Sequence, residues 1–209
     1  MRALALCIAA LAATAAWTAP ATAKIRVVAT IAQIGEPLSA IAGDRAEIAT
    51  LMGEGVDPHL YRLTRSDVAK LTRADLIVYN GLHLEAQMTD MMARFAARKP
   101  VVAVGDALAG SHLLPWDGGG HDPHIWMDPA LWAQALSVAV DALAKADPPN
   151  AAHYRAGAKI YLSQLTSLSE KARTAIASIP KDARALVTAH DAFGYFGRAF
   201  GIDVLAIQG

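Results

Sequence analysis

Residues 150–179 read NAAHYRAGAKIYLSQLTSLSEKARTAIASI, a stretch without proline that is bounded by Pro148-Pro149 on one side and by Pro180 on the other. A helix over its roughly thirty residues would be about 45 Å long, which exceeds the reach of one small lobe. Its apolar residues follow a spacing of three and four, which predicts one buried stripe: Ile160, Leu162, Leu165, Leu168, Ala172 and Ile176. We therefore predict a rigid connecting helix over 149–180 that joins two lobes. The alternative is an ordinary long amphipathic helix packed on a single domain.

On both sides of this helix, short apolar runs alternate with helical segments. The runs predict buried strands because they are apolar throughout and do not alternate with polar residues: 25–31, 46–52, 76–80, 101–104, 185–188 and 204–207. Helical spacing predicts further helices: 37–42, 65–72, 85–97 and 131–145. Thr64-Arg65-Ser66-Asp67 is a capping box at the start of one of them. Strands that alternate with helices predict an α/β fold with mainly parallel sheets.

The predicted strands divide unevenly between the two lobes. Residues 24–148 contain four strands and the helices to cover them, which predicts an N-terminal lobe with a core of its own. Residues 181–209 contain one strand, one helix and one more strand, which is less than a parallel sheet needs to cover both faces. We therefore expect the start of a C-terminal lobe there, incomplete as given.

The first residues have the composition of a targeting segment. Met1-Arg2 is followed by an apolar run over 3–16 and by Ala21-Thr22-Ala23, which together predict a cleavable signal peptide over 1–23 and an exported protein. A membrane anchor is the alternative, although the run is short for a span. A lipoprotein is another, because Cys7 follows apolar residues. Cys7 is the only cysteine, so the exported chain would lack disulfides.

The charged residues balance, with 19 basic and 19 acidic side chains. No long block of like charge occurs, which argues against nucleic acid or an anionic membrane surface as a partner. The sequence also lacks the Gly-x-Ser-x-Gly and P-loop patterns of common nucleophilic and phosphate-binding sites. The chemistry must therefore come from other residues.

Three of the seven histidines occupy positions that favour metal binding. Asp-Pro-His occurs at 57–59 and again at 122–124, and the proline pre-orients the histidine that follows it. His190 closes a predicted strand, and ligands of α/β sheets bind at the carboxyl ends of strands. We predict that His59, His124 and His190 face one crevice and hold Zn²⁺ or a similar metal. The two aspartates either orient an imidazole ring or only start turns.

The other histidines are expected to have lesser roles. His121, which follows the glycine run 118–120, is a possible accessory metal ligand on a mobile loop. His83 follows a predicted strand and is placed near the cleft. His112 and His153 are expected at the surface.

Four segments resemble the motifs of the zinc- and manganese-binding solute-binding proteins of ABC importers: 55–61 (GVDPHLY), 80–85 (NGLHLE), 122–129 (DPHIWMDP) and 188–196 (TAHDAFGYF). The resemblance covers 24–209 in the order of the family. It implies two α/β lobes bridged by a rigid helix, with the metal between them. His59 and His124 would be ligands from the first lobe and His190 a ligand from the second. A fourth ligand, usually an aspartate, would lie beyond Gly209.

The resemblance also implies a function. Such a protein is a periplasmic monomer that captures Zn²⁺ or Mn²⁺ as its transported ligand and delivers it to an ABC transporter permease in the inner membrane, without catalysing a reaction. A zinc hydrolase is an alternative, because three histidines with an open position also describe a catalytic zinc. No His-Glu-x-x-His occurs, however, and Glu54 is expected to face solvent. A binding protein of similar architecture for an iron chelate or cobalamin is a further alternative, but it would need a wide cleft lined by aromatic residues or arginines, which the Asp-Pro-His repeat does not indicate.

Overall fold

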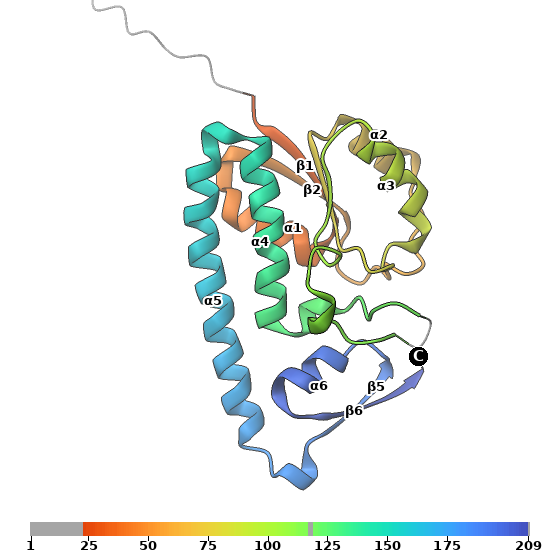
Figure 1. The fold of residues 1–209 in the computed structure, drawn as a ribbon, viewed down its shortest axis with the longest axis vertical. Helices are drawn as coiled ribbons and strands as arrows, with labels where there is room; N and C mark the ends of the chain where they lie inside the picture. The colour runs from red at the N-terminus through yellow and green to blue at the C-terminus, as the bar shows by residue number, and fades with distance from the viewer. Residues whose placement is uncertain (1–22, 117–118, 209) are drawn as a thin grey trace, which may run out of the picture.

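The computed structural model describes residues 23–116 and 119–208. The signal peptide predicted over 1–23 therefore lies outside the described residues, apart from Ala23. Two parallel sheets and a long helix make up the α/β fold (Figure 1), as the sequence predicts. No helix in the described ranges is both long and apolar enough to cross a membrane.

The larger sheet contains four parallel strands in the order β2-β1-β3-β4. Their bounds are β1 (Ile25–Ile31), β2 (Ala46–Met52), β3 (Leu76–Tyr79) and β4 (Val101–Ala103). The central strands are buried on both faces, and Val27 pairs with Ile48 on one side and with Leu76 on the other. This burial explains why these runs are apolar throughout.

Helices cover both faces of this sheet: α1 (Ala32–Ala42), α2 (Arg65–Arg73), α3 (Thr89–Ala96) and α4 (Pro129–Ala146). Figure 1 shows α2 and α3 on the side of the sheet opposite α4. The predicted capping box is confirmed, because the Thr64 side chain accepts a hydrogen bond from the Asp67 backbone and Asp67 accepts one from the Thr64 backbone.

Two predicted helix starts are wrong. The first helix begins at Ala32 rather than Pro37, because Ile34 packs in the core and extends the apolar stripe toward the N-terminus. The third begins at Thr89 rather than Glu85, after a short 3₁₀ turn. There the buried Glu85 carboxylate accepts hydrogen bonds from the backbone of Asn80 and Gly81, which keeps this residue in a turn.

The long helix, α5, spans Ala151–Ala177 and packs against α4 and α1 before it reaches the second sheet (Figure 1). Its buried stripe differs from the predicted one. Ile160 and Leu168 are 65% and 59% exposed, whereas Tyr154 and Ala158 are buried. At 100° per residue, Ile160 lies nearly opposite Ala158 on the helix. The stripe begins earlier and runs through Tyr154, Ala158, Leu165, Ala172 and Ile176, all buried or half-buried.

The second sheet contains β5 (Ala185–His190) and β6 (Asp203–Gln208), which are parallel and joined by α6 (Gly194–Phe200). The prediction that both strands are buried is wrong for the side chains described. Val187, Leu205 and Ile207 are 62%, 60% and 73% exposed. The single helix α6 packs on one face of the sheet, where a side chain at Gly197 would meet Val204. The other face is uncovered among the residues that the structure describes.

Candidate metal site

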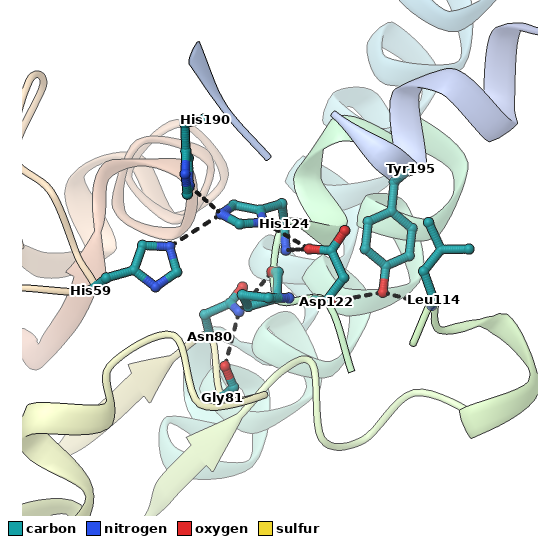
Figure 2. A network of polar contacts seen from close by, with 9 residues as sticks. His59, Asn80, Gly81, Leu114, Asp122, His124, His190 and Tyr195 are labelled. Carbon is teal, nitrogen blue, oxygen red and sulfur yellow. Dashed lines mark hydrogen bonds and ion pairs between the residues drawn. The ribbon is translucent and has the colours of Figure 1, made fainter. Parts of the chain in front are cut away.

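Three histidines from separate segments meet between the two sheets. His59 lies in the loop after β2, His124 in the loop before α4, and His190 at the carboxyl end of β5. Figure 2 shows the three imidazole rings turned toward one another. The Nε2 atom of His124 lies 3.2 Å from Nε2 of His59 and 3.3 Å from Nε2 of His190. The structure thus brings together the three residues that the sequence singles out.

These separations suit a bound cation. Two nitrogens at 2.0–2.1 Å from a tetrahedral zinc are about 3.3–3.4 Å apart. The two measured separations are 3.2 and 3.3 Å, and one nitrogen from each ring lies within 4.8 Å of the others. The arrangement can therefore offer three imidazole nitrogens to one divalent ion.

His124 is the most constrained of the three. Its Nδ1 lies 2.7 Å from Asp122 Oδ1, and the same oxygen accepts a hydrogen bond from the His124 backbone N–H at 2.9 Å. A carboxylate at Nδ1 selects the tautomer in which Nδ1 carries the proton and Nε2 carries a lone pair. The rings of Trp116 and Trp126 lie against the imidazole, which is 2% exposed. Nε2 of His124 is thus held as an acceptor that faces the other two rings.

The first Asp-Pro-His segment has the same turn but a different ring environment. The Asp57 carboxylate accepts a hydrogen bond from the His59 backbone N–H at 2.9 Å but makes no hydrogen bond with the His59 ring. The loop is tied down after His59 instead, because the Tyr61 hydroxyl donates to Asp67 at 2.7 Å. Of the two roles left open for the aspartates, Asp57 starts a turn, whereas Asp122 starts a turn and orients a ring.

A buried network supports the His124 loop from the larger sheet. The side-chain amide of Asn80 donates to the carbonyl oxygens of Gly81 and Pro123, at 3.1 and 3.0 Å. Figure 2 places Asn80 beside the loop segment that links Asp122 to His124. Asn80 begins the motif segment 80–85 and ends the predicted strand 76–80, but neither pattern indicates its hydrogen bond to Pro123.

The electrostatics at His59 favour a neutral imidazole. Burial lowers the pKa of His59, and the proximity of His124 and His190 lowers it further, whereas Asp57 opposes the shift. Protonation of one ring would place a positive charge beside two other rings. A neutral ring is the form that binds a metal.

The remaining histidines lie outside this group. His121 is exposed, and its backbone pairs with Pro115 across the loop. His83 is exposed and borders a separate small cavity of about 100 Å³ together with Glu85 and Asp106. His112 and His153 are exposed, as predicted.

Comparisons with known proteins identify the family. Residues 27–209 match the family model described as zinc-uptake complex component A, periplasmic. The chain is 40% identical over 187 residues to the manganese-binding lipoprotein MntA of Bacillus subtilis, covering 89% of this chain and 61% of that protein. It is 40% identical over 191 residues to the zinc-binding protein TroA of Treponema pallidum, covering 91% and 62%.

The solved structure of the periplasmic zinc-binding protein TroA from Treponema pallidum superposes with a TM-score of 0.87, at 40% identity, covering 90% of this chain and 68% of that one. The chain therefore belongs to the zinc-uptake component A family. A further relative, 32% identical over 191 residues and covering 87% of this chain and 61% of that protein, is named metal ABC transporter substrate-binding lipoprotein SsaB, from Streptococcus sanguinis. The family resemblance seen in the sequence is confirmed, and so are the α/β fold and the long helix. The chain spans about three fifths of the length of these curated relatives, 61% and 62%.

Proposed function

We propose that this chain captures a divalent transition metal, Zn²⁺ or Mn²⁺, with His59, His124 and His190. The observation that carries the proposal is the convergence of three imidazole nitrogens, with separations of 3.2 and 3.3 Å from His124 Nε2. The relatives support it, because one is named manganese-binding and another zinc-binding.

The donor set favours Zn²⁺ over Mn²⁺. Imidazole nitrogens suit zinc, whereas manganese prefers carboxylate, carbonyl and water oxygens. The described residues contribute three imidazoles to the group and no carboxylate oxygen. Three neutral ligands also leave the charge of the ion unbalanced, and an added carboxylate would make the site more acceptable to Mn²⁺. We therefore expect measurable Zn²⁺ binding and weak Mn²⁺ binding.

The residues around the three histidines favour metal binding over hydrolysis as the function of the site. A catalytic zinc needs a general base within reach of its bound water. Asp122 is engaged by the His124 ring and backbone, and Glu85 accepts hydrogen bonds from the Thr30 hydroxyl and two backbone amides. Glu54 is exposed on its loop. The relatives MntA and TroA are named as metal-binding proteins, which points in the same direction.

The remaining parts of the proposal concern the setting of the protein. We place the chain in the periplasm, exported by the segment 1–23, where it acts as a monomer and delivers its metal to an ABC transporter permease in the inner membrane. Residues 24–148 form the first lobe, 149–180 the connecting helix and 181–209 the start of the second lobe. The family description, which is periplasmic, supports this setting.

Metal analysis tests the proposal directly. The protein is purified from the exported fraction without added metal, and its bound metals are measured beside those of the His59→Ala and His124→Ala variants. We expect close to one equivalent of Zn²⁺ in the native chain, and much less in each variant. Retention of equal metal by both variants would contradict the assignment. A native chain that binds no Zn²⁺ under equilibrium dialysis would contradict the function itself.

A further inference from the structure

Helix α6 touches the His124 loop through a buried phenol. The Tyr195 hydroxyl donates to the backbone carbonyl of Asp122 at 2.8 Å and accepts from the Leu114 backbone N–H at 3.0 Å. Figure 2 shows the phenol between Asp122 and Leu114. Tyr195 is fully buried, and burial raises its pKa to about 12, so its hydroxyl remains a donor at neutral pH. A residue of the smaller sheet's helix thus holds the loop of the larger lobe.

The same aspartate connects this contact to the metal site. Its carbonyl receives the hydrogen bond from Tyr195, and its side chain accepts from the ring and the backbone of His124. The carbonyl group and the side chain of one residue are joined at its Cα atom, so they move together while the side chain keeps its rotamer. A displacement of the Asp122 carbonyl would therefore shift the carboxylate that fixes the His124 ring.

A second contact shows how closely α6 fits Asp122. A Cβ atom at Gly194 would lie 3.2 Å from the Asp122 carboxylate oxygen Oδ2 and 3.2 Å from Leu114. Glycine is therefore the residue that allows the start of α6 to approach this carboxylate. Arg198, one turn further along α6, donates to the His112 carbonyl at 2.8 Å and lies 3.6 Å from the Asp128 carboxylate. All these partners belong to the loop and helix start between 112 and 128.

We propose that Tyr195 is a positioning residue for metal capture, acting through Asp122 on the orientation of His124. His190 ends β5 and lies five residues before Tyr195 in α6, so the β5–α6 segment supplies the third imidazole and also holds the loop that carries the second. Docking of α6 then assembles two ligands in one step, and its departure loosens both. The inference rests on the proposed role of the three histidines in metal binding.

The experiment compares Tyr195→Phe with Tyr154→Phe as a matched control. Tyr154 is also fully buried, and its hydroxyl donates to the Asp147 carboxylate, which is not part of the group formed by His59, His124 and His190. Zn²⁺ affinity is measured by competition with a chromophoric chelator, Co²⁺ spectra report the ligand geometry, and ¹⁵N spectra of the metal-free protein report the His124 tautomer. Thermal unfolding measures the loss of stability in each variant.

We expect Tyr195→Phe to weaken Zn²⁺ binding by about tenfold, in the range typical of residues that orient metal ligands. It should also change the Co²⁺ spectrum and mix the His124 tautomers. Tyr154→Phe should lower the melting temperature without these changes. Equal affinity, spectrum and tautomer in Tyr195→Phe and the native chain would overturn the inference while leaving the proposed function intact.

Two further arms keep the outcomes distinct. If Tyr195→Phe does not fold, Gly194→Ala replaces it, because the added Cβ presses on the Asp122 carboxylate without removing a buried hydrogen bond. Unchanged affinity and an unchanged His124 tautomer in Gly194→Ala would then overturn the inference. If the native chain itself binds no Zn²⁺, the proposed function fails, and the positioning role fails with it.

Discussion

Replacing Asp122 by asparagine removes the negative charge beside His124 while keeping the size of the side chain. Asn can still accept the hydrogen bond from the His124 backbone, so the turn should persist. What is lost is the charge-assisted contact at 2.7 Å to His124 Nδ1. A hydrogen bond to a charged group contributes about 1.5–3 kcal/mol and a neutral one about 0.5–1.5 kcal/mol, so the substitution costs about 1–1.5 kcal/mol. Because about 1.4 kcal/mol corresponds to a tenfold change in affinity, we expect Zn²⁺ affinity to fall by about 5- to 10-fold.

The repeated tripeptide supplies a matched control for this prediction. Asp57→Asn changes the same residue in the same turn, but the Asp57 carboxylate accepts its hydrogen bond from the His59 backbone, at 2.9 Å, and not from the His59 ring. Its Zn²⁺ affinity should stay within about threefold of the native value, since exposed charges contribute little. Calorimetric titration at pH 7.5, with circular dichroism as a check of folding, gives both numbers. Equal losses in the two variants, or no loss in Asp122→Asn, would refute the argument that Asp122 orients the ring.

Three further results are expected. Zn²⁺ affinity should fall as pH drops below about 6.5, because protons compete with the metal for the imidazoles, and an affinity unchanged from pH 8 to 5 would argue against histidine ligation. Because burial lowers the pKa of His59, the metal-free fold should also lose stability as pH falls. His190→Ala should weaken Zn²⁺ binding at least tenfold, while His121→Ala should leave it unchanged, as measured by dialysis against ⁶⁵Zn²⁺. The reverse result would mean that His121, and not His190, binds the metal. In urea unfolding, Leu165→Ala should lower the free energy of unfolding by about 1–2 kcal/mol and Ile160→Ala by less than about 0.5 kcal/mol, since Ile160 is 65% exposed. Equal losses would show that Ile160 is buried, as the sequence predicts.

Strands and ligands were predictable for local reasons. The runs around Val27 and Ile77 are apolar because both faces of their sheet are covered, and this leaves a continuous signal in the sequence. The histidines at 59 and 124 follow prolines, whose effect on the backbone is local. The same local logic fails at β5 and β6, where Val187 and Leu205 are as apolar as core residues but are more than half exposed. Composition reports what a strand can bury, and the packing of other elements decides whether it does.

The roles of Asn80 and Tyr195 were not predictable, because their partners are distant in the sequence. Asn80 donates to Pro123, 43 residues away, and Tyr195 donates to Asp122, 73 residues away. No local pattern encodes such contacts, since they depend on how the loop before α4 lies against the larger sheet and against α6. The starts of α1 and α3 were misplaced for a similar reason, because the burial of Ile34 and Glu85 decides them.

Zinc K-edge X-ray absorption of the zinc-loaded chain counts the imidazoles that are bound to the ion. We expect a first shell that contains three nitrogens at about 2.0–2.1 Å, with the outer-shell scattering of imidazole rings. The same measurement on His124→Ala should show one imidazole fewer. A first shell built from oxygen alone, or one that is unchanged in His124→Ala, would contradict the claim that His59, His124 and His190 hold the metal together.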